Sequence, residues 1–126
     1  MTINDPAVVA ELTQLYAKYE AALMANDAET LTQMFWTSPH AMRFGIGETL
    51  HGIAEIEAFR KARPPVNLTR TVKRLDIVTF GREFASVTLE FERVVNGKKT
   101  SGRQSQAWVR LPEGWRIVSA HVSILP

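Results

Sequence analysis

The sequence predicts an α+β fold, in which a curved sheet of mixed or antiparallel strands forms a cone around three helices from the N-terminal half. Two patterns support this prediction. Apolar residues recur at spacings of three and four before residue 63 and at every second residue after residue 68, so helices precede strands. Short turns rich in Gly, Asn and Pro separate the later strands, as in an antiparallel meander. Because three helices cannot lie within such a sheet, we expect it to curl around an apolar helix face and leave one open end.

The first two elements are expected to be helices. Asp5 before Pro6 is typical of a helix start, and an apolar stripe then continues over about 20 residues. Asn26, with Glu29 three residues later, fits the cap of a second, short helix that ends by Pro39. The stripe of the first helix consists of Val8, Leu12, Leu15, Tyr16, Tyr19 and Leu23.

Residues 40–65 combine apolar side chains with an arginine, a carboxylate and a histidine, the mixture that a polar pocket needs. We expect a strand carrying Arg43, a turn through two glycines, and a short return strand holding Glu48 and His51. A third helix should follow from about Ile53 and end at two prolines.

The second half of the chain predicts four strands. Two strands are expected over 68–80 and 84–95. A tight hairpin at Asn96–Gly97 leads into a third strand, and a turn at 111–114 leads into the last one, over 115–124. If Val95 pairs with Lys98, Gln104 lies opposite Leu89. If Arg110 pairs with Trp115, Gln104 also lies opposite His121, and the two polar side chains share one face.

Both faces of this sheet carry many apolar side chains. One face can cover the helices, and we expect the other to meet a second copy of the chain in a homodimer. The alternative is a monomer with scattered surface valines. The first face is predicted to hold Val87, Leu89, Phe91, Gln104, Gln106, Trp108, Ile117, Ser119 and His121, and the second Glu90, Arg103, Ser105, Ala107, Val109, Val118, Ala120 and Val122.

Length and composition limit the classes of function. The 126 residues suit one domain, 1–126, and the absence of cysteine excludes a disulfide framework and a thiol nucleophile. No metal-ligand spacing and no cofactor motif occurs, so we expect neither a metal nor a cofactor. Without a signal segment or an apolar run of membrane length, a cytoplasmic protein without membrane contact is expected. The net charge of +2 is small and dispersed, which favours a small anionic partner over nucleic acid.

Several polar residues are candidates for a site. Tyr19 lies on an apolar helix stripe, so its hydroxyl must find a partner in the interior or in a cavity; a purely structural role is the alternative. Arg43, between apolar neighbours, either holds a substrate or pairs with Glu48 across the turn. Arg60 and Arg63 fall where cations are favoured at any helix end, so both could simply be solvated.

The remaining candidates lie on the sheet. Gln104 and His121 could hold a ligand by hydrogen bonds, although a lone histidine is more often structural. Taken by themselves, these residues leave open whether the chain is an enzyme for small anions or a binding module.

Four stretches cover nearly the whole chain and carry a resemblance. They read YEAALMANDAETLTQMFW at 19–36, RFGIGETLHGIAEIEAFRKAR at 43–63, RTVKRLDIVTFG at 70–81 and GRQSQAWVRLPEGWRIVSAHVSIL at 102–125. Together they resemble the AtzH-like proteins of the nuclear transport factor 2-like superfamily, whose cone is also called cystatin-like or SnoaL-like. The resemblance implies a part in cyanuric acid breakdown beside an amidase-signature enzyme. It also implies decarboxylating hydrolysis of 1,3-dicarboxyurea to allophanate.

The resemblance also points to a tyrosine of the first helix and an arginine of the first strand, here Tyr19 and Arg43. We therefore expect Tyr19 to act as general acid/base and Arg43 to clamp a carboxylate. The residues expected to bind substrate beside them are Glu48, Arg60, Gln104 and His121. The alternative function is a non-catalytic module that binds a small carboxylate or supports an amidase.

Overall fold

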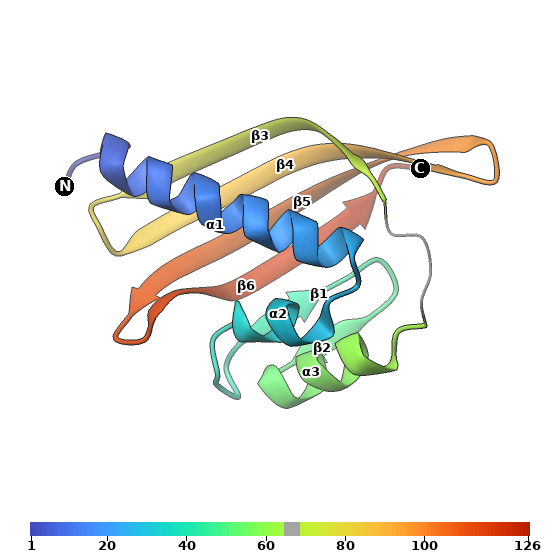
Figure 1. Ribbon diagram of the computed structural model, residues 1–126, viewed down its shortest axis with the longest axis horizontal. Coiled ribbons are helices and arrows are strands. Elements are labelled where there is room, and N and C mark those ends of the chain that lie inside the picture. The colour runs from blue at the N-terminus through green and yellow to red at the C-terminus, as the bar shows by residue number, and fades with distance from the viewer. Residues whose placement is uncertain (65–68) are drawn as a thin grey trace.

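The structure is a computed structural model that describes residues 1–64 and 69–126. Three helices and six strands make up this part of the chain (Figure 1). The helices are α1 (Pro6–Met24), α2 (Ala28–Gln33) and α3 (Ile53–Ala62). The strands are β1 (Met42–Phe44), β2 (Thr49–His51), β3 (Thr71–Phe80), β4 (Phe84–Val95), β5 (Lys98–Leu111) and β6 (Gly114–Ile124). This order confirms the predicted α+β arrangement.

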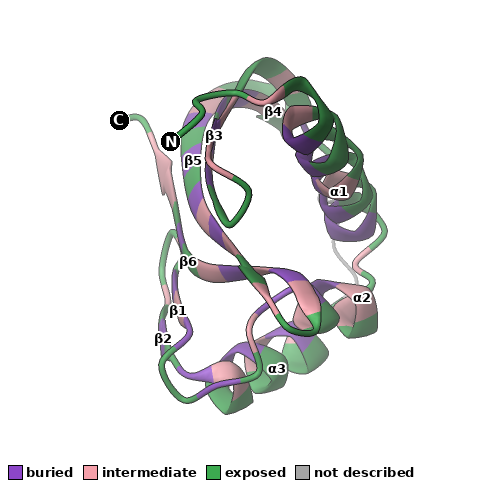
Figure 2. Ribbon diagram, turned by 90° about the vertical axis from the view of Figure 1, so that its left-hand side faces the viewer, coloured by how far each residue is buried: buried purple, intermediate pink, exposed green. Residues whose placement is uncertain are grey.

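The six strands form one mixed sheet in the order β2-β1-β6-β5-β4-β3. All neighbours are antiparallel except β1 and β6, which run parallel. The sheet curves strongly, with α1 across its concave side and α2 and α3 closing the end beside β1 (Figure 2). Because α1 presents one buried stripe to this concave side, the core lies between helix and sheet.

The caps of the first two helices follow from short acidic residues. The Asp5 side chain accepts a hydrogen bond from the Ala7 backbone N–H at 3.0 Å, as predicted. At the second helix the prediction was off by one residue: Asp27, not Asn26, accepts from the Thr30 N–H, at 3.1 Å. Asn26 instead has a φ of 51°, a left-handed conformation that asparagine tolerates better than most residues.

The third helix begins at Ile53, as the sequence predicted. It ends at Ala62, and Arg63 is already extended, which agrees with the preference of a residue ahead of a proline. The second of the two prolines and the predicted start of the next strand at residue 68 lie outside the described residues. The described part of that strand, β3, begins at Thr71.

The strand register is partly as predicted. Val95 pairs with Lys98 and Leu89 with Gln104, which confirms the hairpin arithmetic. In the next hairpin the register shifts, because Trp108 pairs with Ile117 but Ala107 pairs with Ser119. Val118 is therefore an extra residue in β6, a β-bulge that reverses the facing of every later residue in the strand.

This bulge overturns part of the face assignment. Gln104 lies opposite Val122, not His121, and Gln106 lies opposite Ala120. The prediction that Gln104 and His121 share a face is therefore wrong, as are the outward placements of Ala120 and Val122. The inner face keeps its other predicted members apart from Ser119.

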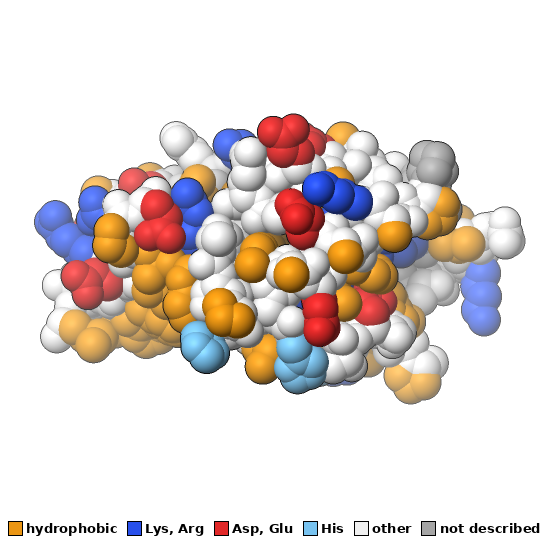
Figure 3. Space-filling view, turned by 90° about the horizontal axis from the view of Figure 1, so that it is seen from below, with side chains coloured by type: hydrophobic (Ala, Val, Ile, Leu, Met, Phe, Trp, Pro, Cys, Tyr) orange, Lys and Arg blue, Asp and Glu red, His pale blue; other side chains and the backbone are white. Residues whose placement is uncertain are grey.

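The predicted homodimer has no counterpart in a single chain and stays a prediction. The surface does carry exposed apolar side chains, including Phe84 at 39% and Phe44 at 38% exposure. Hydrophobic side chains gather towards one end of the face seen from below (Figure 3). No helix in the described ranges is long and apolar enough to cross a membrane.

Gly102 in β5 offers a test of the packing between neighbouring strands. A Cβ at this position would clash with the edge of the Phe91 ring, which is 1% exposed and covered by the Arg70 guanidinium at 4.4 Å from the ring centroid. Because the ring cannot swing away, we expect Gly102→Ala to lower the free energy of unfolding by about 1–3 kcal/mol. Urea unfolding followed by circular dichroism measures the change.

The matched control is Gly47→Ala, since nothing lies within 4 Å of a Cβ there. Equal stability losses in the two variants would contradict the close approach of Phe91 to the β5 backbone.

Candidate active site

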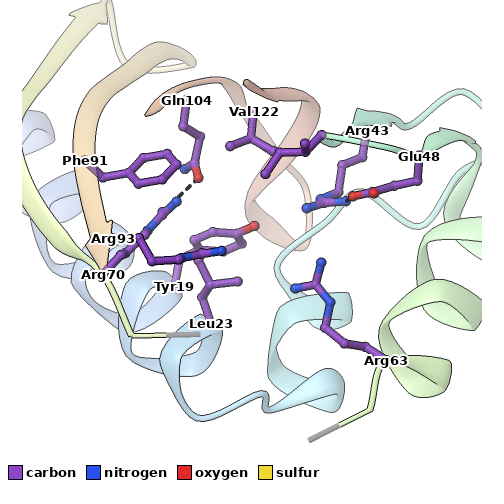
Figure 4. Close-up of a pocket in the computed structure, with 11 residues that line it drawn as sticks. Tyr19, Leu23, Arg43, Glu48, Arg63, Arg70, Phe91, Arg93, Gln104 and Val122 are labelled. Carbon is purple, nitrogen blue, oxygen red and sulfur yellow. Dashed lines mark hydrogen bonds and ion pairs between the residues drawn. The ribbon is translucent and has the colours of Figure 1, made fainter. Parts of the chain in front are cut away.

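A cavity opens at the wide end of the cone, between α1 and the curved sheet (Figure 4). Its volume is about 80 Å³, which suits only a small ligand. Its walls come from α1, β4, β5, β6 and the segment around the β1–β2 turn. The lining residues are Tyr19, Leu23, Arg43, Ile46, Glu48, Arg63, Arg70, Phe91, Arg93, Gln104 and Val122.

Tyr19 brings a phenol from α1 to this cavity. Its side chain belongs to the buried stripe of the helix and is only 3% exposed. The hydroxyl oxygen accepts a hydrogen bond from Nη2 of Arg60, on α3, at 2.9 Å. The interior partner that the stripe position required is therefore a guanidinium.

The electrostatic surroundings of Tyr19 favour its ionised form. Burial raises the pKa of the phenol, but the positive charges of Arg60, Arg43 and Arg70 lower it, and the net shift is downward. A phenol with a lowered pKa exchanges protons more readily near neutral pH than an ordinary tyrosine.

Arg43 enters the cavity from β1. It is 6% exposed, and its Nη1 donates to Oε1 of Glu48 at 2.8 Å. Its guanidinium also lies 5.5 Å from the ring centroid of Phe59. The Glu48 carboxylate occupies the space where a side chain on Gly45 would begin, so the absence of a Cβ at Gly45 permits this pair. Arg43 thus points into the cavity and also forms the predicted pair with Glu48.

A hydrogen-bonded network forms the wall on the other side of Tyr19. Arg70 donates from Nε and Nη2 to the two oxygens of Glu20 at 2.8 and 2.9 Å, and from Nη2 to Oε1 of Gln104 at 2.8 Å. Tyr16 donates to Glu20 at 2.7 Å and accepts from Gln104 at 3.0 Å. With its amide held at both ends, Gln104 has a fixed orientation at the cavity wall.

This network gives its members shifted pKa values. Burial raises the pKa of Glu20, but the hydrogen bonds and charge of Arg70 outweigh burial, and the net shift is downward. Burial and the adjacent Glu20 carboxylate raise the pKa of Tyr16 well above its ordinary value. The two tyrosines of α1 are therefore pushed in opposite directions.

Two further arginines reach the cavity near its mouth. Arg63 follows α3 and lies over the Phe59 ring at 4.9 Å, and Arg93 projects from β4. Burial and neighbouring arginines lower the pKa of both side chains. In the described part of the chain neither forms a salt bridge with a carboxylate. Both guanidiniums thus remain available to an anion.

The whole chain, residues 1–126, matches the family model described as AtzH-like. The chain belongs to the AtzH-like family. Two solved structures are similar to the chain over nearly its whole length. This chain is 44% identical to a protein of unknown function from Pectobacterium atrosepticum, with a TM-score of 0.93 over 98% of this chain and 95% of that one. It is 41% identical to a cystatin-like fold protein from Burkholderia xenovorans, with a TM-score of 0.90 over 100% and 99% of the two chains.

More distant structures show the fold alone. A putative ketosteroid isomerase from Parabacteroides distasonis has a TM-score of 0.71 at 16% identity, over 88% of this AtzH-like chain and 85% of that one. The fold is therefore the nuclear transport factor 2-like, cystatin-like cone, as the sequence predicted. No curated protein matches this chain.

The structure brings most of the predicted site residues of this AtzH-like chain together. Tyr19, Arg43, Glu48 and Gln104 all line the cavity. Arg60 does not line it, because it lies behind Tyr19 at 1% exposure and reaches the cavity only through the phenol. His121 does not line it either, because the β6 bulge turns its exposed ring to the outer face, edge-on to Phe44. It does line a smaller neighbouring hollow to which Tyr19 and Arg43 also contribute.

Sequence reasoning missed three arginines of the cavity as ligands. Arg93 continues the alternation of Leu89 and Phe91 on the inner face, so the confirmed register could have identified it. Arg63 was noticed only as a cation at a helix end. Arg70 lies outside the regular strands, and no periodicity places its side chain.

The Arg70–Glu20 pair predicts a dependence of stability on pH. The folded pKa of Glu20 is below its ordinary value of 4.5, so the pair stabilises the fold above that pH and loses this contribution as pH falls through the folded value. We expect Glu20→Gln to cost about 2 kcal/mol at neutral pH and less in acid. Urea unfolding between about pH 6 and pH 3 measures both differences.

Glu113→Gln, in the exposed β5–β6 turn, is the control. A stability gap between wild type and Glu20→Gln that stays constant across this pH range would contradict the lowered pKa.

Proposed function

We propose that this AtzH-like cavity catalyses decarboxylating hydrolysis of a carboxylated urea, 1,3-dicarboxyurea, to allophanate. The observation that carries the proposal is the meeting of Tyr19 and Arg43 in one cavity lined by further unpaired guanidiniums. A small planar dianion matches such a site because arginine presents a fork of donors to a carboxylate. The cavity volume of about 80 Å³ restricts the ligand to a molecule of about this size.

In the proposed reaction one C–N bond breaks. The bond joins a terminal carboxylate carbon to a urea nitrogen; its electron pair stays on the nitrogen, which takes a proton. With water as co-reactant, the dianion yields allophanate and bicarbonate, so atoms and charge balance. Tyr19 exchanges the proton as general acid/base, and Arg43 holds the carboxylate that leaves.

The second carboxylate of the substrate needs its own cation. Arg63 and Arg93 fit this role better than the sequence-based candidates, because they reach the cavity and have no carboxylate partner among residues 1–64 and 69–126. Gln104 adds an oriented amide. His121, on the outer face, is left without a part in this proposal.

The site predicts severe losses in two variants. We expect Tyr19→Phe to lower kcat/KM for dicarboxyurea by about 10²-fold or more, since it removes the proton-transferring group. Arg43→Lys should lower it at least about 10-fold, since lysine cannot form two parallel hydrogen bonds to a carboxylate. Steady-state release of allophanate measures both effects.

His121→Gln is the control, because the ring is exposed on the other face of the sheet. Parental turnover by folded Tyr19→Phe protein would refute the acid/base role. Saturable binding of dicarboxyurea without any product would instead favour the alternative function, a non-catalytic carboxylate-binding or amidase-accessory module.

If Arg63 and Arg93 bind the second carboxylate, we expect their loss to weaken binding of dianions more than binding of monoanions. Arg63→Gln and Arg93→Gln should each raise KM for dicarboxyurea about 10-fold by removing a charge-assisted hydrogen bond. Inhibition by a monocarboxylated urea should change much less. Arg103→Gln is the matched control, because Arg103 is exposed on the outer face of β5. An equal effect on both ligands would place the two arginines outside the second carboxylate site.

The proposed setting follows the family. We place the protein in the cytoplasm, in nitrogen metabolism that includes cyanuric acid breakdown, beside an amidase-signature enzyme. A homodimer through the outer sheet face is part of this proposal, and the exposed Phe84 on that face supports it.

A further inference from the structure

Arg60 is a cation buried without an acidic partner. It is 1% exposed, and within the described residues its side chain makes one hydrogen bond, to the Tyr19 hydroxyl at 2.9 Å. Its Nε and Nη1 are buried with no hydrogen-bond partner in residues 1–64 and 69–126. A guanidinium in such a place is strongly disfavoured unless a negative charge stands nearby.

The missing charge cannot come from a ligand in the cavity. The unpaired nitrogens of Arg60 are inaccessible, and Arg60 is not among the residues that line the cavity. Within the described chain, no carboxylate lies within salt-bridge distance of it either. Tyr19 is the ionisable group in direct contact with Arg60.

We propose that Arg60 is a positioning residue that holds Tyr19 as a phenolate in the resting cavity. The inference rests on the proposed function, which it deepens by giving Tyr19 a starting protonation state. Tyr19 then first accepts a proton, from water or from the incoming substrate, and returns it to the urea nitrogen when the C–N bond breaks. Arg60 acts only through Tyr19 and never touches the substrate.

The charges around Tyr19 support this state. They come from every side of the cavity. The charged or titratable groups are Tyr16 and Glu20 from α1, Arg43 from β1, Glu48 after the turn, Arg60 and Arg63 from α3 and its end, Arg70 ahead of β3, Arg93 from β4, and His121 from β6, which shares a smaller hollow with Tyr19.

The balance of these groups is positive. Five guanidiniums face two carboxylates, Glu20 and Glu48, which leaves a net charge of about three positive units. Ionisation of Tyr19 lowers this net charge to about two positive units, which balances the two negative charges of the proposed substrate. The site is then neutral when occupied.

The two tyrosines of α1 also differ in their hydrogen bonds. Tyr16 donates to the Glu20 carboxylate, which requires its proton, whereas Tyr19 accepts from Arg60, which does not. The opposite directions of their pKa shifts agree with this difference. Tyr16 is therefore an internal reference for Tyr19 in the same helix.

An ultraviolet titration without substrate tests the inference, because the chain has only two tyrosines. Phenolate absorbs at longer wavelength than phenol. We expect about one phenolate per chain in the wild type and in Tyr16→Phe near neutral pH, and none in Tyr19→Phe. In Arg60→Met the phenolate should form only in alkali, near or above the ordinary tyrosine pKa of about 10. Arg60→Lys, which keeps the charge, should restore much of the neutral-pH signal.

Lys61→Met is the matched control, since Lys61 is exposed on the next position of the same helix. Absence of phenolate in the wild type at neutral pH would overturn the inference. An unchanged titration in Arg60→Met would overturn the part played by Arg60. If Arg60→Met does not fold, the comparison of wild type, Tyr19→Phe and Arg60→Lys still decides. A phenolate without any turnover of dicarboxyurea would leave this inference standing and refute the proposed function instead.

Discussion

Burial of arginine beside a limited number of acidic groups is the constraint on which the cavity depends. Each buried guanidinium needs a partner from another part of the chain. Arg70 takes Glu20 on α1, Arg43 takes Glu48 beyond the β1–β2 turn, and Arg60 takes Tyr19. These polar contacts therefore link α1 to α3 and to the segment ahead of β3, and β1 to the turn that follows it. The architecture that holds the fold together there also concentrates positive charge.

The apolar core sets the frame for this polar end. Side chains such as Leu12, Phe35 and Trp108 are fully buried between the helices and the concave side of the sheet. Further along the inner face, polar side chains take the positions that apolar ones hold elsewhere, and they hydrogen-bond to α1 instead of packing against it. Gln104 occupies one such position, four residues along the same strand from Trp108. A hydrophobic core and a charged cavity thus share one continuous face.

Much of this could be predicted from the sequence, because local patterns determine it. The stripe of α1 identified Tyr19, and the Asn96–Gly97 turn fixed the pairing of β4 with β5. The bulge at Val118 could not be predicted, since an extra residue leaves no mark in a strand that is apolar on both faces. That one residue turned His121 away from the cavity. Arg70 and the buried position of Arg60 were equally hidden, because they depend on how distant elements pack.

The pairing of Arg43 with Glu48 affects how a ligand would bind to the cavity and leave it. The Glu48 carboxylate is already paired with Arg43. A ligand carboxylate that replaces it gains only the difference in free energy between two similar contacts, not that of a whole ion pair. When no ligand is bound, the Arg43 guanidinium is still paired, because Glu48 lies close to it, two residues past Ile46. In the proposed function, such an arrangement favours rapid release of the product over tight retention.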